Sequence, residues 1–390
     1  MKLLLTFTDN VSLEDWNNIG LINREISLYK KLLKKNMNIC FLTYGTKEDL
    51  KFSKILEGIN IIPCSDLVKS KIPGITFIKS LFLPIRLKEY FRKVDIIKTN
   101  QLNGSWVAWI AKLLFRKKLI IRGGYDWLTN HINLYKLKGS KSYLKYVLLY
   151  FQIFILELIA YKLADGIILT SEMHISYIIK YFKLKKKLKK NRIYLLRNFI
   201  DINLFKPAPL KKKDKHVLFI GRLSNEKNLF NLLDAINELD GFFLDIIGSG
   251  PEEEILKKRV EDLRINVKFH GVLPNNKIPE KINQYQIFIL PSFYEANPKS
   301  LLEAMSCGVA CIGTNVWGIG NIINHKENGY LCGTSSNSIK RAIETLYNNQ
   351  LLREKIGKNA RTFILENCSL NSISNKEYEF YNELLNRKFD

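Results

Sequence analysis

The stretch PSFYEANPKSLLEAMSCG, residues 291–308, decides how this sequence is interpreted. The apolar run before it reads as a buried strand, and Asn297-Pro298 predicts a helix with Asn297 as its N-cap and Pro298 at its first position. Glu295 then lies in the loop at the carboxyl edge of the strand, whereas Glu303 lies inside the helix. Because ligands of open α/β sheets bind at that edge, the two carboxylates predict a site for a polyhydroxylated ligand.

A second strand-to-helix turn lies upstream in HVLFIGRLSNEKNLFNLLDAINEL, residues 216–239. A strand ends at Gly221, an amphipathic helix follows, and Arg222 and Lys227 flank the turn. A guanidinium fork and an ammonium group therefore converge where the amino end of a helix offers free N–H groups. This arrangement predicts a diphosphate site, although two surface charges at an ordinary turn remain an alternative.

A third turn follows the strand FFLDII and contains Gly248 and Gly250. Two glycines so close together let the backbone approach a flat ligand closely. Taken alone, this is a weak signal.

Strands and helices alternate through both halves of the chain, which is typical of doubly wound parallel sheets. Because 390 residues exceed one ordinary core, we predict an α/β fold with two Rossmann-like domains. An exposed linker with Pro207, Pro209 and the lysine run Lys211–Lys213 is expected between them. The predicted strands are KLLLTFT, NICFLTY, VDIIKT, KLIIRG and GIILTS in the first half, and HVLFIG, FFLDIIG, VKFHG, QIFILPS and VACIGT in the second.

Four segments in this order, GRLSNEKN, IIGSGPEEEIL, LPSFYEANPKSLLEAMSCG and GIGNIINHKENGYLC, resemble the donor-binding half of the GT-B glycosyltransferases of family 4. The resemblance is strong over residues 190–370 and covers the amino-terminal half only in outline. It implies two Rossmann-like domains that face a central cleft. Residues 1–205 would bind the acceptor, residues 206–373 would bind the nucleotide-sugar donor, and residues 374–390 would form a helix crossing back to the first domain.

The activity implied by the resemblance is that of a retaining, hexosyltransferase-type enzyme. It would move a sugar from a nucleotide-diphosphate sugar, with a UDP-sugar favoured, to a hydroxyl of a growing cell-surface glycan or a lipid-linked acceptor. A nucleotide-sugar epimerase or a phosphorylase of the same fold is the alternative. No D-x-D triplet occurs in the chain, so we expect the cationic turn to neutralise the diphosphate without a metal or other cofactor.

Family resemblance assigns roles to individual residues. Arg222 and Lys227 would hold the donor diphosphate and stabilise it as it departs, Glu303 would accept both ribose hydroxyls, and Glu295 would bind a hydroxyl of the transferred sugar. The other residues expected at the donor are Gly221, Gly248, Gly250, Asn297, Pro298 and Lys299.

The sequence departs from the family pattern at three positions. Ala296 replaces a usual glycine, Trp317 stands where glycine is common, and Asn321 stands where another acid is frequent. These changes are expected to reshape the sugar and acceptor ends of the site.

The amino-terminal half offers fewer candidates. Gly20, at the start of a predicted helix, is expected to present its N–H to the diphosphate, unless it serves only as a structural cap. Relatives carry a histidine after the fourth strand, whereas LIIRGGYDWL offers Arg122 and Asp126. These two residues are the predicted catalytic candidates here, and His131 is a weaker one.

The net charge of +24 lies almost entirely in the first half of the chain. Residues 1–200 contain 36 Lys and Arg against 14 acids, or +22, whereas residues 201–390 contain 25 against 23, or +2. Such a field concentrates anions, so a membrane surface, an anionic acceptor or nucleic acid is the expected partner. No interleaved aromatic and basic signature supports nucleic acid.

The apolar segment YLKYVLLYFQIFILELIAYKLADGIILTS is compatible with a buried helix or an interfacial helix. A membrane span is the third alternative, although the longest uncharged run, Tyr146–Leu156, is too short for it. The neighbouring cluster KYFKLKKKLKKNR reads either as a solvated loop or as a site of docking on anionic lipid.

No signal peptide is apparent, because Met1–Phe7 reads as a first strand. The six cysteines show no metal-binding spacing, and we expect neither disulfides nor a metal site. The expected location is the cytoplasm, at the inner face of the membrane.

Overall fold

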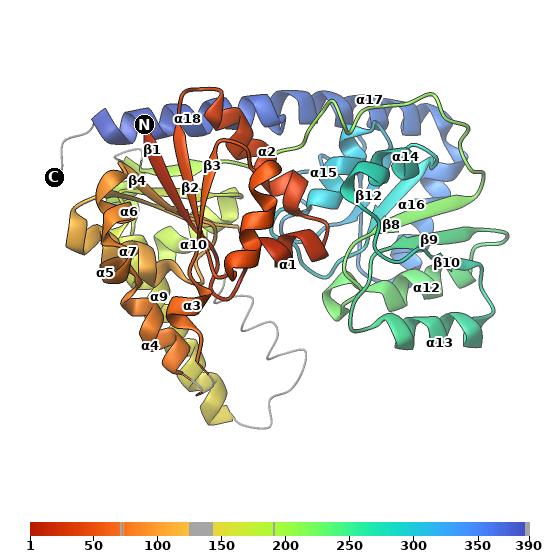
Figure 1. Cartoon of the computed structure of the whole chain (residues 1–390). Helices are drawn as coiled ribbons and strands as arrows, with labels where there is room; N and C mark the ends of the chain where they lie inside the picture. Colours follow the sequence, from red (N-terminus) through yellow and green to blue (C-terminus); the bar gives the residue numbers. More distant parts are fainter. Residues whose placement is uncertain (71, 73, 125–142, 190–191, 387–390) are drawn as a thin grey trace. The chain divides into compact units, whose positions relative to one another are not determined.

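The computed structural model describes residues 1–70, 72, 74–124, 143–189 and 192–386. They form two compact units, of which the first comprises Met1–Leu196 and Ser374–Asp390 and the second comprises Arg197–Ile373. Each unit contains one parallel sheet covered by helices (Figure 1). The predicted α/β fold with two Rossmann-like domains is therefore confirmed.

The sheet of unit 1 has the strand order β3-β2-β1-β4-β5-β6-β7. Its central strand β1 is fully buried from Leu3 to Leu5, as expected for a parallel sheet covered on both faces. The edge strands β3 and β7 are absent from the sequence prediction. The strands are β1 (Lys2–Thr6), β2 (Asn38–Thr43), β3 (Ile59–Pro63), β4 (Ile96–Thr99), β5 (Lys118–Gly123), β6 (Gly166–Leu169) and β7 (Ile193–Leu195).

The helices of unit 1 are mostly short before β5 and longer after it. They are α1 (Leu13–Asn18), α2 (Ile22–Leu33), η1 (Lys47–Lys54), α3 (Ser65–Val68), α4 (Ile75–Leu81), α5 (Leu83–Arg86), α6 (Lys88–Lys93), α7 (Ser105–Phe115), α9 (Tyr143–Leu163), α10 (Glu172–Phe182) and α11 (Lys185–Lys189). Helix α18 (Leu370–Asn386) ends the described chain, and its residues from Ser374 onward belong to this unit.

The sheet of unit 2 has the order β10-β9-β8-β11-β12-β13, so the strand order reverses between β8 and β11. Figure 1 shows α12 and α13 below this sheet and α14 and α15 above it. The short edge strand β13 was not predicted. The strands are β8 (His216–Ile220), β9 (Phe243–Ile247), β10 (Val267–Phe269), β11 (Ile287–Leu290), β12 (Ala310–Thr314) and β13 (Tyr330–Cys332). The helices are η2 (Asn225–Lys227), α12 (Leu229–Asn237), α13 (Glu253–Leu263), η3 (Asn275–Lys277), α14 (Ile278–Ile282), α15 (Lys299–Ser306), α16 (Ser336–Asn348) and α17 (Gln350–Asn367).

Helix α9 is buried in one half and exposed in the other. Ala160 and Tyr161 are completely buried near its end, whereas Leu148 and Phe151 remain more than half exposed. Of the alternatives that the sequence left open, burial therefore applies to the second half of this helix and not to Leu148 and Phe151. No helix in the described ranges meets the length and apolarity that crossing a bilayer requires.

A buried ion pair joins α18 to the sheet of unit 1. Lys98 on β4 pairs with Glu377 on α18, and both side chains are almost completely excluded from solvent. Tyr381 also donates to this carboxylate, and the Lys98 ammonium lies 3.4 Å from the Tyr29 hydroxyl. Removing one partner would leave a buried charge uncompensated, so the pair fixes where α18 packs.

The segment between the two sheets is exposed at Pro207, Pro209, Lys211 and Lys212, as the sequence predicts. It is also hydrogen-bonded to the rest of unit 2. Arg361 donates to the carbonyls of Ile202 and Phe205 at 3.0 and 2.7 Å. Farther along, Lys212 donates to the Asn283 carbonyl at 2.7 Å. Local composition does not predict these bonds, because the bonded residues lie 71 or more positions apart in the chain.

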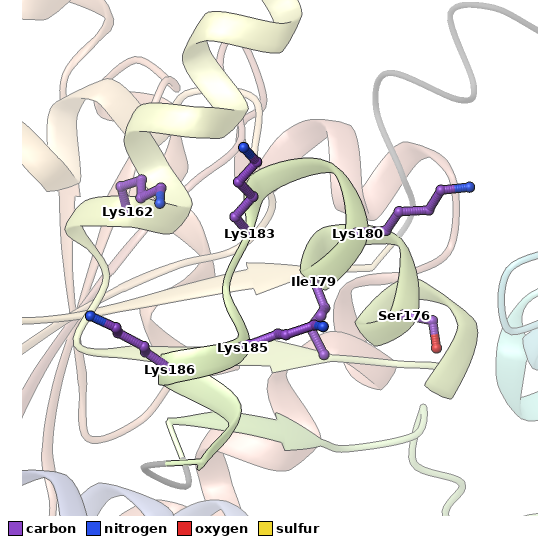
Figure 2. A pocket seen from close by; sticks show the side chains of 7 residues that line it. All are labelled: Lys162, Ser176, Ile179, Lys180, Lys183, Lys185 and Lys186. Atoms are coloured by element: carbon purple, nitrogen blue, oxygen red, sulfur yellow. The ribbon is translucent and has the colours of Figure 1, made fainter.

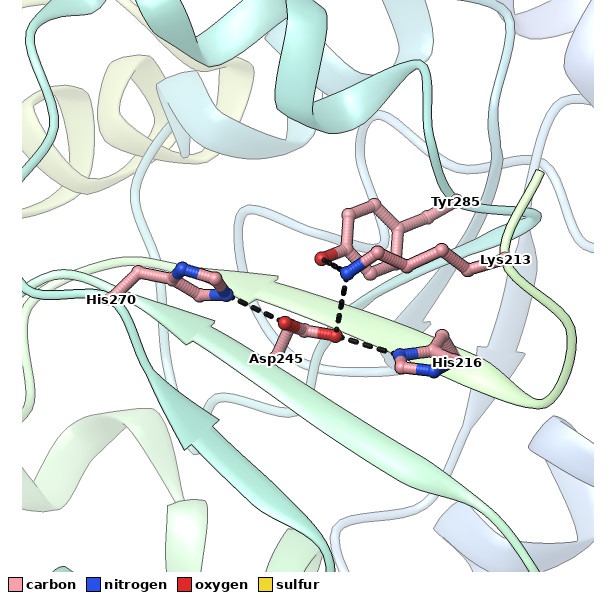
Figure 3. A network of polar contacts seen from close by, with 5 residues as sticks. All are labelled: Lys213, His216, Asp245, His270 and Tyr285. Carbon is pink, nitrogen blue, oxygen red and sulfur yellow. Dashed lines mark hydrogen bonds and ion pairs between the residues drawn. The ribbon is translucent and has the colours of Figure 1, made fainter. Parts of the chain in front are cut away.

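Lys213 belongs to a polar network around Asp245, a buried carboxylate in β9 (Figure 3). His216 Nδ1 and His270 Nε2 lie 2.8 and 2.6 Å from the two carboxylate oxygens, and the Lys213 ammonium lies 3.5 Å from Oδ2. Lys213 also donates to the Tyr285 hydroxyl at 2.9 Å. Burial raises the pKa of Asp245, but the hydrogen bonds from both imidazoles and the Lys213 charge outweigh it, so this pKa lies below its ordinary value.

Asp245→Asn should lower the free energy of unfolding at neutral pH by about 3 kcal/mol. This value is at the low end of the range for breaking a buried ion pair, because the side chains of Lys213 and His216 remain partly exposed to water. Because the pKa of Asp245 is lower in the folded state, its carboxylate stabilises the folded protein at pH values above the unfolded-state pKa of about 3.9. This stabilisation is lost as the pH falls through the folded-state pKa. Urea unfolding at neutral and acid pH should therefore show the wild-type and Asn curves converging in acid. Exposed Asp240→Asn is the matched control, and an equal loss in both variants would contradict this account.

Candidate functional site

The candidate site lies at the carboxyl ends of β8 and β11 in unit 2. These neighbouring strands flank the point where the strand order reverses. Loops leave the sheet there in opposite directions, and such switch points form the ligand crevices of open α/β sheets. The loop after β8 carries Arg222 and Lys227, and the loop after β11 carries Glu295.

Two glycines pack the turn after β9 against the turn after β8. A Cβ on Gly248 would lie 1.9 Å from the Gly221 carbonyl oxygen, and a Cβ on Gly250 would lie 2.2 Å from that of Leu223. The Leu223 N–H donates to the Ser249 carbonyl at 2.9 Å across this contact. These glycines therefore serve a backbone-to-backbone contact, while their contact with a ligand remains a prediction.

Asn228 ties three loops of this edge together. Its backbone is left-handed, with φ 57° and ψ 36°, a conformation that Asn tolerates better than most residues. The buried side-chain amide donates to the carbonyls of Pro291 at 3.0 Å and Thr334 at 2.8 Å. The loops after β8, β11 and β13 are thereby held at fixed positions, and α12 begins at the next residue.

Lys227 and Glu295 form an ion pair within the site. The ammonium lies 2.5 Å from Glu295 Oε1, and the two side chains are only 16% and 11% exposed. Ser292, which is fully buried, donates to the same oxygen at 2.8 Å. Both contacts use Oε1, so Oε2 retains its lone pairs for another donor. Lys227 has three N–H donors, and the ion pair leaves some of them for a ligand.

The loop that carries Glu295 is held by its backbone as well. The Phe293 N–H donates to the Glu226 carbonyl at 2.8 Å, and the Glu295 N–H donates to the Trp317 carbonyl at 3.1 Å. Gly318 has φ 86°, and a Cβ there would lie 2.1 Å from the Glu295 carbonyl oxygen. Trp317 is thus placed beside Glu295, and its buried indole N–H has no hydrogen-bond partner among the described residues.

Unlike Lys227, Arg222 is exposed and has no ion-pair partner among the described residues. Its guanidinium forms no ion pair or hydrogen bond with any residue that the structure describes. No side chain from the described residues caps the amino end of α12, where N–H groups are concentrated. An anion at this turn would therefore meet a free guanidinium, a constrained ammonium and a helix amino end.

Helix α15 begins one residue later than predicted. Pro298 is its N-cap rather than its first helical residue, and no side chain forms a cap hydrogen bond. The Asn297 carbonyl accepts a 2.8 Å bond from Asn198, and the Lys299 ammonium lies 5.5 Å from the Phe199 ring centre. Glu303 lies inside the helix as predicted and is only 4% exposed. A carboxylate buried to this degree is rarely a solvated surface group.

The candidates in unit 1 are only partly described. The Gly20 N–H donates to the Asn17 carbonyl at 2.9 Å, which closes a turn before α2. Arg122, near the end of β5, donates to the Asn100 carbonyl at 3.2 Å. Asp126 and His131 lie outside the described residues. The roles predicted for these four residues remain predictions.

Asp9 was missed by the sequence reasoning. It follows β1 at the strand-order reversal of unit 1, where its N–H donates to the Asn103 carbonyl at 3.3 Å. One carboxylate oxygen is buried without a hydrogen-bond partner among the described residues. Burial raises the pKa of Asp9 despite opposing hydrogen bonds from Asn10 and Tyr44. The only signal in the sequence is an acid two residues after an apolar strand.

Residues 201–363 match the protein-family model described as Glycosyl transferases group 1. The match includes both loops of the site and all of α15. This part of the chain is similar to group 1 glycosyltransferases.

Three curated relatives show how similar this chain is to known proteins. N-acetyl-alpha-D-glucosaminyl L-malate synthase of Bacillus anthracis is 28% identical over 50% of this chain and 51% of its own length. The amylovoran biosynthesis glycosyltransferase AmsD of Erwinia amylovora is 27% identical over 52% of this chain and 57% of its own. The chain thus spans little more than half the length of these two. An uncharacterized glycosyltransferase of Methanocaldococcus jannaschii is 26% identical over 96% of this chain and 91% of its own length.

Solved structures extend the likeness beyond residues 201–363 to nearly the whole chain. Anabaena HepE, solved in complex with UDP and with UDP-glucose, matches with a TM-score of 0.75 at 16% identity over 98% of this chain and 100% of that chain. A glycosyltransferase from Rickettsia africae matches with a TM-score of 0.74 at 18% identity over 99% of both chains. At these identities the likeness establishes the fold, which is GT-B.

Replacing Asn228 should separate what its side-chain hydrogen bonds contribute to stability from what its tolerance of a left-handed backbone contributes. Asn228→Gly keeps the left-handed backbone and loses the amide bonds to Pro291 and Thr334, so it should destabilise the protein by about 2 kcal/mol. Asn228→Ala loses the same bonds and adds strain, so it should cost about 1 kcal/mol more. Chemical unfolding measures both. An alanine variant as stable as the glycine variant would contradict the constraint described here.

Proposed function

We propose that this chain transfers a sugar from a nucleoside diphosphate sugar to an acceptor hydroxyl during glycan synthesis, with the anomeric configuration retained. The observation that carries the proposal is the ion pair of Lys227 with Glu295 at the switch point of unit 2, with the exposed cation Arg222 in the same loop as Lys227. It places charges for a diphosphate next to an acceptor for sugar hydroxyls.

The diphosphate would bind at the turn after β8. The exposed fork of Arg222 suits bidentate binding of phosphate oxygens, and Lys227 adds a point charge that Glu295 orients. The amino end of α12 contributes N–H groups beside them. A diphosphate would compete with Glu295 for the ammonium, or share it through the remaining N–H donors.

The nucleoside and the sugar would extend in opposite directions from the diphosphate. Buried Glu303 suits the two vicinal hydroxyls of a ribose, because one carboxylate accepts two charge-assisted hydrogen bonds. Glu295 Oε2 suits a hydroxyl of the transferred sugar, and the indole N–H of Trp317 is a further donor beside it. UDP is the favoured carrier, supported by the UDP complexes of structural neighbours with the same fold.

Catalysis would rest on positioning and on stabilising the departing diphosphate. Cations act most strongly where negative charge develops, and Arg222 and Lys227 lie where that charge would appear. We assign no covalent nucleophile, and the donor phosphate itself would assist removal of the proton from the acceptor hydroxyl. Because two protein cations are available, the proposed reaction requires no metal.

The acceptor would be a growing cell-surface glycan or a lipid-linked sugar bound to unit 1. Asp9 and Arg122 occupy the carboxyl edge of its sheet, the edge at which α/β domains bind ligands. The large positive charge of this half supports peripheral attachment to an anionic membrane. An epimerase or phosphorylase of the same fold would be distinguished by measuring donor turnover with and without the acceptor.

Glu303→Ala should weaken binding of the bare nucleoside diphosphate by about tenfold to a hundredfold, since a charge-assisted hydrogen bond contributes about 1.5–3 kcal/mol. Glu303→Gln should lose less, because one acceptor oxygen survives. Titration calorimetry with UDP and with the 2′-deoxy analogue measures the effect. The alanine variant should not discriminate between the two nucleotides, and undiminished discrimination would contradict the ribose assignment.

Arg222→Ala and Lys227→Ala should each lower turnover by about a hundredfold. The unfolding midpoint should stay nearly unchanged in Arg222→Ala, whose side chain is exposed, and fall in Lys227→Ala, which leaves the Glu295 carboxylate without its ion-pair partner. Steady-state rates with a UDP-sugar donor, with and without EDTA, test both this assignment and the absence of a metal requirement. Arg264→Ala, an exposed arginine after α13, is the matched control. Activity that strictly depends on an added divalent cation would overturn the metal-free mechanism.

A further inference from the structure

A cavity in unit 1 is lined mainly by lysines. Lys162 from the end of α9, Lys180 from α10 and three residues of the following turn and α11 surround a space of about 960 Å³, with Ile179 in its wall (Figure 2). The three are Lys183, Lys185 and Lys186. A space of this size is typical of a small-molecule site rather than of a gap that a single ion fills.

The charge of this cavity is not balanced by nearby acids. None of the five lysines forms an ion pair with any residue that the structure describes. From Met173 to Ile200 the sequence contains seven Lys and two Arg and no acidic residue. Five ammonium groups around one cavity repel one another, and an anion would relieve that repulsion.

The surroundings add further positive charge. Lys187 bonds to the Ala164 carbonyl, and burial, together with the charges of Arg192, Lys112 and Lys162, lowers its pKa to about 8. Asp165 is the nearby acid, and it already pairs with Lys112. Burial is the largest cause of this lowered pKa, and the neighbouring cations add to it while Asp165 opposes it.

The backbone that carries the lysines is well fixed. Ser171 caps the start of α10, and Phe182 and Leu184 are buried on either side of Lys183. Lys183 itself has φ 55° and ψ 45°, a left-handed helix end at which glycine is ordinarily favoured. The backbone around the lysine-lined cavity is therefore fixed by the packing of Phe182 and Leu184.

The walls of the cavity suit a ligand with an apolar part as well as phosphates. Ile179 and the methylene stems of the lysines are apolar, and the neighbouring Tyr181 leaves half of its ring surface exposed. On the same helix as Lys162, Leu148 and Phe151 are exposed as well. A soluble phosphate uses only the ammonium groups, whereas a lipid headgroup at a membrane surface uses both features.

We propose that the lysine cavity binds the phosphate-bearing headgroup of an anionic lipid. The proposal deepens the membrane attachment proposed above and rests on it. In this proposal one cavity accounts for membrane binding, instead of the positive charge of unit 1 as a whole. The donor site lies in unit 2, so occupancy of the cavity and binding of the nucleotide are separately measurable.

The test compares two triple variants with the same change in net charge. Lys180→Gln, Lys183→Gln and Lys186→Gln remove three lysines of the cavity, and Lys30→Gln, Lys34→Gln and Lys54→Gln remove three exposed lysines elsewhere in unit 1. Vesicles of phosphatidate in phosphatidylcholine should bind the cavity variant about a hundredfold less than the wild type, and the control variant less than tenfold less. Equal losses would mean that the whole basic field attracts the membrane, and would overturn the cavity assignment.

Two further measurements keep the test decisive. Inorganic pyrophosphate at matched ionic strength should displace the protein from vesicles only weakly, and displacement at micromolar pyrophosphate would assign the cavity to a soluble phosphate instead. Lys183→Gly removes a cavity cation at a position where glycine is favoured, so it should fold at least as well as the wild type and still bind vesicles less. UDP affinity should be unchanged in every variant, which separates failure here from failure of the proposed sugar transfer.

Discussion

The left-handed backbone of Asn228 is the constraint on which the candidate site at the carboxyl edge of the unit 2 sheet depends. Its side-chain amide holds the loops after β11 and β13, and its backbone ends the turn after β8. Lys227 is the preceding residue, so the position of its ammonium opposite Glu295 follows from the conformation of Asn228. A residue in this conformation carries strain, and the two buried hydrogen bonds offset it.

The ion pair between Lys227 and Glu295 orients polar groups of the site before any ligand binds. Ser292 and Lys227 both engage Glu295 Oε1, which leaves one defined oxygen and some ammonium donors for ligands. Groups already oriented by the fold lose little freedom when a ligand binds. Residues 201–390, which include this turn, carry a net charge of only +2, so the cations of the turn act locally. The general attraction of anions arises in residues 1–200, where the +22 excess lies.

The sequence predicted the centres of both sheets because buried parallel strands are continuous apolar runs such as LLL in β1 and IFIL in β11. It did not predict β3, β7 and β13, which are short edge strands whose pairing depends on neighbours far along the chain. It predicted the exposure of the linker but not the contact of Lys213 with Asp245, since charge composition carries no information on a partner 32 residues away. Glu295, Arg222 and Lys227 were found through their positions after strands. Asp9 was missed because its burial becomes visible only in the fold.

The central claim is that a nucleoside diphosphate binds at the carboxyl edge of the unit 2 sheet. Hydrogen–deuterium exchange of the full chain with and without UDP tests it most directly, because exchange reports local opening peptide by peptide. The account predicts slower exchange in residues 221–231 and 291–306, with residues 253–263 on the outer helix α13 unchanged. Protection confined to unit 1, or no protection at saturating UDP, would contradict the account.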